Sequence, residues 1–210
     1  KQLRSWKRRN PDLFIHLELG SFQSPQIMSH LLDLISEVPI DSLGMNQEEL
    51  DAAAGLLKLS MKTNPSASWQ KSILVAELLQ DKTGIFRVSV HTRDYILSVI
   101  RDGLLPAQNE ISSLQCGVDA AASLAAGGSI RAAPPEEYNE KGLAAAADLR
   151  RLGAVSQGSG SILHFGSRIV SLVPARQVSR PLITVGLGDT ATASIFYCEL
   201  EAIRTEGLRS

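Results

Sequence analysis

Along the chain, apolar positions recur with either a helical or a strand-like period. Between Ile27 and Val38 they follow a helical spacing, and Ser24 followed by Pro25 is typical of a helix start. We expect further helices before Pro11 and over 48–59, 66–79, 120–126, 140–152 and 190–204. Short apolar runs predict strands over 13–17, 85–90, 162–165, 169–173 and 182–185, with a hairpin around Gly166-Ser167, and a short strand or turn over 42–45. Because strands alternate with helices, the pattern predicts a layered α/β domain with a mostly parallel sheet.

The composition changes this picture mainly by excluding classes of protein. The 210 residues are 44% hydrophobic and 20% charged, which suffices for a real core in one large domain or about one and a half. With 21 Lys+Arg against 22 Asp+Glu, the net charge of -1 lacks the positive footprint of a nucleic-acid binder. Apolar runs all stay well short of the roughly 18 residues that a membrane span needs.

The two cysteines indicate the cellular compartment of the protein, and the first residue indicates whether the sequence is a piece of a longer chain. Cys116 and Cys198 lie far apart in sequence, which fits neither a disulfide scaffold nor a zinc site. Such cysteine usage suits a reducing compartment, and with no visible signal peptide it predicts a cytoplasmic protein. Because the chain begins at Lys1 without Met, we interpret it as a C-terminal piece of something longer.

Ligands of such sheets gather beyond the carboxyl ends of the strands, and the segment Thr184–Thr190 has the strongest signal there. Gly186 and Gly188 let the backbone approach a ligand, and the N–H groups of a helix start attract anions. Asp189 could cap this helix or take a proton from a nucleophile. A dinucleotide fingerprint is disfavoured, because too few residues follow Ala191 for the second strand that it needs.

Three weaker signals also lie at expected strand ends. Asn46 and Glu49 have the spacing of a helix capping box, which is the structural alternative to a ligand role. His16 and Glu18 share one face of a strand, where a satisfied polar contact is equally reasonable. His91-Thr92 closes the strand over 85–90.

Taken together in this order, these motifs resemble the ADP-dependent sugar kinases, the glucokinase and phosphofructokinase family of the ribokinase-like fold. The resemblance runs from about Phe14 to Glu201 and includes Val173-Pro174-Ala175-Arg176-Gln177-Val178. It implies a three-layer α/β sandwich, of which residues 1–210 would be the C-terminal, nucleotide-binding part. The lid and most sugar contacts of the family belong to an N-terminal part that has no counterpart here.

The resemblance also assigns roles to residues. Asp189 would be the general base, with Gly186, Leu187, Gly188 and Asp189 offering N–H groups to the moving phosphoryl group. Mg²⁺ would be held by Glu18, Glu49 and Asp189, partly through water. The ADP contacts that it implies are Asn46, His91, Thr92, Val178 and Gly188, although ordinary core packing is the alternative for Val178. Three acids would repel the phosphates of ADP without a cation, and a lysine-bearing P-loop is absent from the sequence.

The implied reaction transfers the terminal phosphoryl group of ADP to glucose or fructose 6-phosphate, giving AMP and a sugar phosphate. The implied partners are therefore ADP or AMP and a hexose or hexose phosphate, with neither nucleic acid nor a membrane span. Two alternatives stay open, namely a truncated module that binds nucleotide without turnover and an ATP-dependent ribokinase-type enzyme. The sequence determines neither the acceptor sugar nor the oligomeric state.

Overall fold

The computed structural model describes residues 1–20, 24–57, 68–103 and 105–207, which divide into two compact units. Unit 1 consists of Lys1–Val90 and Ser98–Arg101, and unit 2 consists of His91–Leu97 and Asp102–Ser210. Strand β4 (Tyr95–Arg101) contributes residues to both units. The strand order is β1-β2-β3-β4 through unit 1 and β4-β7-β6-β5 through unit 2. The predicted α/β class is confirmed.

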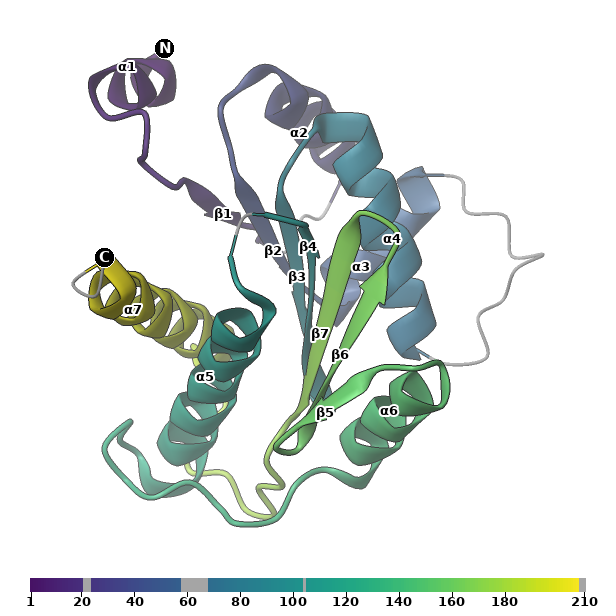
Figure 1. The fold of residues 1–210 in the computed structure, drawn as a ribbon, viewed down its shortest axis with the longest axis vertical. Helices are drawn as coiled ribbons and strands as arrows, with labels where there is room; N and C mark the ends of the chain where they lie inside the picture. The colour runs from purple at the N-terminus through teal and green to yellow at the C-terminus, as the bar shows by residue number, and fades with distance from the viewer. Residues whose placement is uncertain (21–23, 58–67, 104, 208–210) are drawn as a thin grey trace. The chain divides into compact units, whose positions relative to one another are not determined.

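Unit 1 contains parallel strands at its N-terminal end. Its other elements are α1 (Gln2–Arg9), β1 (His16–Glu18), α2 (Pro25–Glu37), β2 (Ser42–Asn46), α3 (Gln47–Leu56), α4 (Ser68–Thr83) and β3 (Arg87–His91). In the parallel pair β1–β2, His16 lies opposite Ser42 and Glu18 lies opposite Gly44. Helices α2, α3 and α4 contact one another beside these strands (Figure 1), and their buried residues include Leu32, Leu50 and Leu79. The carboxyl ends of β1 and β2 therefore share one edge.

Unit 2 contains antiparallel strands between helices. Its elements are α5 (Ala107–Gly127), α6 (Glu140–Arg151), β5 (Val155–Gln157), β6 (Gly160–Phe165), β7 (Arg168–Pro174) and α7 (Leu187–Gly207). The β6–β7 hairpin predicted around Gly166-Ser167 is confirmed, and β5 pairs with β6 in the same antiparallel sense. Helices α5 and α7 lie side by side, and α6 covers the other face of β6 and β7 (Figure 1). The loops that join β5, β6 and β7 are too short to contain the crossover helix that parallel neighbours need. These strands are therefore antiparallel, and the sheet is mixed.

The expected strand over 182–185 is wrong. Leu182 and Val185 are 72% and 83% exposed, and the N–H groups of Leu182 and Ile183 donate to the carbonyl of Ala125. The segment is thus tied to the end of α5 rather than to a strand, although its apolar pattern resembles one. The pattern also missed β4 and β5, and it missed the first half of α5, which begins at Ala107 rather than at Ala120. The predicted break at Asn64-Pro65-Ser66 lies outside the described residues.

A disulfide joins Cys116 of α5 to Cys198 of α7, which corrects the interpretation that these cysteines fit no disulfide. They are 82 residues apart in sequence, but the packing of α5 against α7 brings their Cα atoms to 6.7 Å. Gly117 allows this close approach, because a Cβ there would lie 2.8 Å from the carbonyl oxygen of Ala191. Sequence separation alone could not reveal the pairing.

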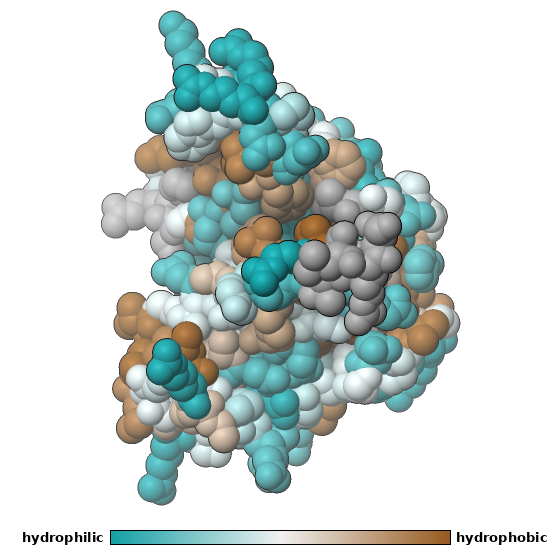
Figure 2. Space-filling view, turned by 60° about the vertical axis from the view of Figure 1, so that its left-hand side comes forward, coloured by the Kyte–Doolittle hydropathy of each residue, from teal (hydrophilic) through white to brown (hydrophobic). Residues whose placement is uncertain are grey.

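The surface mixes hydrophilic and hydrophobic residues, as one face of the molecule shows (Figure 2). Apolar side chains that stay exposed on α7 include Tyr197, Leu200 and Ile203. Within the described ranges, helices long and apolar enough to cross a membrane are not found.

Candidate functional site

The start of α7 carries the motif that the sequence singled out most strongly. Gly186 has a φ of 75°, a conformation that glycine adopts readily, and its carbonyl accepts the first helical hydrogen bond, from Thr190 N at 3.0 Å. The N–H groups of Leu187, Gly188 and Asp189 therefore precede the hydrogen-bond ladder of the helix. The positive end of the helix dipole lies at the same point, and the Asp189 side chain is exposed there. This geometry suits a bound anion and leaves Asp189 accessible.

His91 lies directly against this helix start. A Cβ added at Gly188 would lie 2.8 Å from Cε1 and 3.3 Å from Nδ1 of the His91 ring. His91 ends β3 and Gly188 is in the first turn of α7, so the fold brings together two residues that are 97 positions apart (188 − 91). The structure thus juxtaposes two of the residues that the resemblance placed around ADP.

Thr92 stabilises the turn between β3 and β4 through its side chain. Its hydroxyl donates to the carbonyl of Tyr95 at 2.9 Å and accepts from the N–H groups of Asp94 and Tyr95 at 3.1 and 3.0 Å. The side chain therefore holds the turn that follows His91. A role for Thr92 toward ADP stays a prediction.

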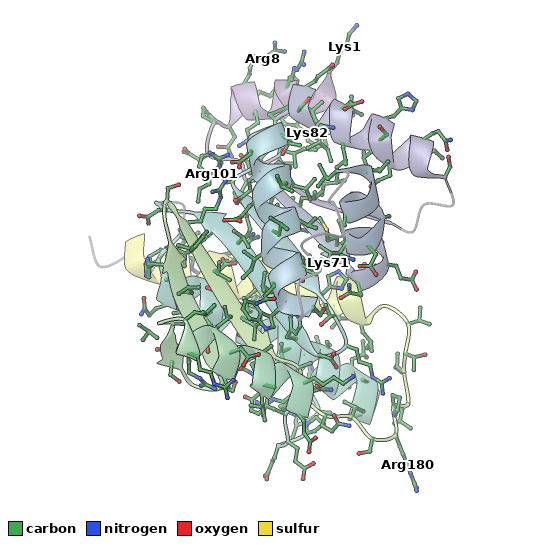
Figure 3. All side chains as sticks on the ribbon, turned by 90° about the vertical axis from the view of Figure 1, so that its right-hand side faces the viewer. Lys1, Arg8, Lys71, Lys82, Arg101 and Arg180 are labelled. Atoms are coloured by element: carbon green, nitrogen blue, oxygen red, sulfur yellow. A yellow bond between two sulfur atoms is a disulfide. The ribbon has the colours of Figure 1, made fainter. Side chains whose placement is uncertain are left out.

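Val178 is partly exposed in the segment between β7 and α7. Two residues before it, the Arg176 guanidinium pairs with Asp119 of α5 at 2.7 Å and stacks 4.0 Å from the ring centroid of Tyr138. Gln177 N–H also donates to the carbonyl of Glu137, so the start of the segment is held on both sides. Arg180, further along, projects outward from the chain (Figure 3). The accessible part of Val178 is consistent with a contact to a ligand.

In unit 1, Glu18 is the last residue of β1, at the carboxyl edge that β1 shares with β2. Its Oε2 accepts a hydrogen bond from His16 Nε2 at 2.9 Å, which is the contact that their spacing along one strand face suggested. The Glu18 side chain is 24% exposed, so it remains reachable from solvent.

Asn46 and Glu49 form the capping box at the start of α3. Asn46 Oδ1 accepts from Glu49 N at 3.0 Å, and Glu49 Oε2 accepts from Asn46 N at 2.8 Å. Glu49 Oε1 also accepts from Asn46 Nδ2 at 3.0 Å, and the residue is 4% exposed. The capping alternative is therefore confirmed, and it holds the Glu49 carboxylate in place beside the end of β2.

The donor set at this edge suits Mg²⁺ better than a softer metal. Both side chains are carboxylates, which offer hard oxygen ligands with about four lone-pair sites each. Mg²⁺ binds through few carboxylates and retains water. Groups of three or more His, Cys, Asp or Glu side chains placed for a metal are not found in the described part of the chain. Because Asp189 is in unit 2, its share in such a site stays a prediction.

Fold and site together define an α/β protein with a glycine-lined helix start beside an accessible carboxylate, a geometry that suits an anionic group. The chain belongs to the family described as the ADP-specific phosphofructokinase/glucokinase conserved region, whose model matches residues 1–198.

Named relatives agree with this membership. The chain is 28% identical over 202 residues to the ADP-specific phosphofructokinase of Pyrococcus horikoshii, with 93% of this chain and 44% of the relative covered. It is 26% identical over 210 residues to the ADP-dependent glucose/glucosamine kinase of Pyrococcus furiosus, covering 88% of this chain and 41% of the relative. The chain therefore spans less than half the length of the curated relatives that it matches.

Among solved structures, the chain superposes on the last common ancestor of ADP-dependent phosphofructokinases from Methanosarcinales with a TM-score of 0.79. The two are 25% identical, and the match covers 94% of this chain and 44% of the ancestral one.

Proposed function

We propose that residues 1–210 are the C-terminal, nucleotide-binding part of an ADP-dependent sugar kinase. The complete protein would transfer the terminal phosphoryl group of ADP to glucose or fructose 6-phosphate, releasing AMP and a sugar phosphate. The lid and most sugar contacts would belong to the part of the relatives that this chain does not match. Family membership supports the reaction class, and relatives named for phosphofructokinase and for glucose/glucosamine kinase activity keep both acceptors open.

The start of α7, with His91 against Gly188, is the observation that carries this proposal. Phosphoryl transfer depends mainly on positioning and on electrostatic stabilisation of the moving group. The N–H groups of Leu187, Gly188 and Asp189 would stabilise its developing negative charge. Asp189 would accept the proton of the attacking sugar hydroxyl, a role that requires the accessible carboxylate found there.

Glu18 and Glu49, together with Asp189, are the residues that would hold Mg²⁺. When bound, the ion would neutralise the phosphates of ADP, which these carboxylates would otherwise repel. The capping box keeps the Glu49 carboxylate in one orientation, and His16 does the same for Glu18. Asn46, His91, Thr92, Val178 and Gly188 would contact ADP, with Val178 against the adenine. A place in glycolysis and a cytoplasmic location belong to the same proposal.

Calorimetric titration of this chain with ADP, with and without Mg²⁺, tests the nucleotide-binding half directly. We expect binding that requires Mg²⁺ and that the variant Asp189→Asn largely retains, because Glu18 and Glu49 would still hold the ion and a base acts mainly in the transition state. A circular dichroism melt of the same sample shows whether the chain is folded. Absence of ADP binding by a folded sample would contradict the proposal.

A further inference from the structure

Four side chains of unit 1 form a hydrogen-bonded chain that leads from the interior of the unit to Glu18. Arg87 Nε donates to Ser42 Oγ at 3.0 Å, Ser42 Oγ lies 2.9 Å from His16 Nδ1, and His16 Nε2 lies 2.9 Å from Glu18 Oε2. Arg87 is 3% exposed and Ser42 is fully buried, whereas the Glu18 side chain is 24% exposed. The chain therefore ends at a carboxylate that solvent can reach.

The chemistry of the two ends sets the direction of these hydrogen bonds. A guanidinium can only donate, so Ser42 Oγ accepts from Arg87 and its own proton is available to His16 Nδ1. An ionised carboxylate can only accept, so His16 Nε2 donates to Glu18. Every link is satisfied when His16 is neutral with its proton on Nε2.

The parallel pairing of β1 with β2 makes this arrangement possible. His16 lies opposite Ser42 and Glu18 lies opposite Gly44, so both side chains extend beside β2. A Cβ at position 44 would lie 2.8 Å from Cδ of Glu18 and 2.9 Å from Cε1 of His16. Gly44 thus leaves the space that the His16–Glu18 pair occupies.

Arg87 is itself held in a defined place. Its guanidinium carbon lies 5.3 Å from the ring centroid of Phe14, within the range of a cation–π interaction. Because the buried end of the chain is anchored in this way, Ser42 Oγ is held at a fixed position beside His16 Nδ1.

We propose that Ser42 is a positioning residue that holds the His16 ring through its Nδ1 and, through that ring, the orientation of the Glu18 carboxylate. The consequence for metal affinity rests on the proposed function, because it requires that Glu18 binds the divalent cation. Partners that orient a metal ligand are often worth ten- to hundredfold in metal affinity. Ser42, which touches neither substrate nor metal in this scheme, acts only through His16.

Nitrogen-15 NMR of the imidazole rings tests the contact between Ser42 and His16 without any metal. The chain has only four histidines, and the variant His16→Gln assigns the His16 signals. At a pH of about 8.5, where an ordinary imidazole is neutral, we expect an unprotonated Nδ1 and a protonated Nε2. In Ser42→Ala, Nε2 should stay protonated against Glu18, whereas the Nδ1 signal should shift because Nδ1 loses its hydrogen bond to Ser42 Oγ. Unchanged shifts in this variant would overturn the proposal.

Ser98→Ala is the matched control, because Ser98 is also fully buried and its Oγ has no hydrogen-bond partner among the described residues. The substitution also removes a buried serine hydroxyl group from a strand. Because that hydroxyl group has no hydrogen bond to His16, the His16 shifts should stay unaltered. A Ser98→Ala spectrum that changes as much as that of Ser42→Ala would show a general packing effect and would also overturn the proposal.

Mn²⁺ binding in the presence of ADP, followed by electron paramagnetic resonance, tests the consequence for Glu18. We expect Ser42→Ala to weaken Mn²⁺ binding about tenfold and Ser98→Ala to leave it unchanged. If Glu18→Gln weakens Mn²⁺ binding but Ser42→Ala binds Mn²⁺ as tightly as the wild type, the positioning role is contradicted. If Glu18→Gln has no effect on Mn²⁺ binding, the proposed metal role of Glu18 fails, and the NMR result still decides whether Ser42 holds the His16 ring.

Discussion

At position 188, a methyl group would lie 2.8 Å from Cε1 of His91, closer than real side chains approach one another. The absence of a side chain there is therefore what allows the end of β3 to meet the first turn of α7. Glycine also leaves the N–H groups of this turn accessible to an anion. At residue scale, the candidate site depends as much on missing side chains as on reactive ones.

Gly188→Ala should consequently displace His91 and weaken ADP binding. We expect a loss of about 1–3 kcal/mol in the free energy of unfolding, the usual cost of overpacking, together with a higher Kd for ADP. Denaturant unfolding and calorimetry measure the two effects. Gly55→Ala is the control, since nothing lies within 4 Å of a Cβ there and α3 should gain up to about 1 kcal/mol. Equal ADP affinity in both variants would contradict the assigned contact.

Asp189→Asn should remove most turnover from the complete protein while leaving ADP binding largely intact. A positioned general base contributes about 10²–10⁴-fold, so kcat should fall by that factor. Steady-state kinetics together with ADP titration separate the two effects. Glu201→Gln, which alters an acid in the last turns of the same helix, should keep normal kcat. A fully active Asp189→Asn enzyme would exclude Asp189 as the base.

Glu49→Gln removes the negative charge of the Glu49 side chain but keeps an oxygen that can cap α3. The amide oxygen can still accept the hydrogen bond from Asn46 N, so the helix start should survive while affinity for Mg²⁺ decreases. A magnesium titration of ADP binding measures this change. Glu48→Gln is the matched control, because Glu48 is the exposed neighbouring acid of the same first turn. An unaltered titration in Glu49→Gln would leave Glu49 with its capping role alone.

At the scale of elements, α5 organises unit 2. It packs closely against α7 at Gly117, bonds covalently to it through Cys116, and pairs with Arg176 through Asp119. Near its C-terminal end, the carbonyl oxygen of Ala125 accepts hydrogen bonds from the N–H groups of Leu182 and Ile183. One helix therefore holds both ends of the segment that carries Val178 and leads to the start of α7.

Reduction of the Cys116–Cys198 disulfide should lower the thermal stability of the chain. Cross-linking residues 82 positions apart restricts the unfolded chain, and native disulfides typically contribute about 2–4 kcal/mol. Melting curves with and without a reductant measure the loss. The double variant Cys116→Ser/Cys198→Ser should melt like the reduced protein and should not respond to reductant. Identical melting of the oxidised and reduced wild type would contradict a stabilising role.

At the scale of the whole molecule, the candidate residues are divided between the two units. Glu18, Asn46 and Glu49 belong to unit 1, whereas His91, Val178 and Asp189 belong to unit 2. The match covers only 44% of the Pyrococcus horikoshii relative, so the reaction is proposed for the complete protein and not for this chain alone.

The complete protein should phosphorylate its sugar with ADP and produce AMP, and ATP should be a much poorer donor. Chromatographic detection of AMP and sugar phosphate, with glucose and fructose 6-phosphate supplied in turn, measures donor and acceptor preference together. The 210-residue chain should bind ADP without turnover. Efficient use of ATP in place of ADP would instead support a ribokinase-type enzyme.

Local patterns were sufficient for the elements whose stability comes from their own residues. The periodic run in α2, the capping box of α3 and the β6–β7 hairpin could all be predicted, because caps, turns and amphipathic faces depend on neighbours in sequence. The segment over 182–185 was misjudged because its N–H groups bond to Ala125, a distant residue.

The sequence by itself determined the α/β class, the order of the motifs and the candidate chemistry of Gly186–Asp189, because these follow from residue type and spacing. Only the tertiary structure decided that His91 lies against Gly188, that Ser42 lies between Arg87 and His16, and that Cys116 meets Cys198. Each of these contacts joins different elements. Its geometry is set by strand register and helix packing, which local sequence does not encode.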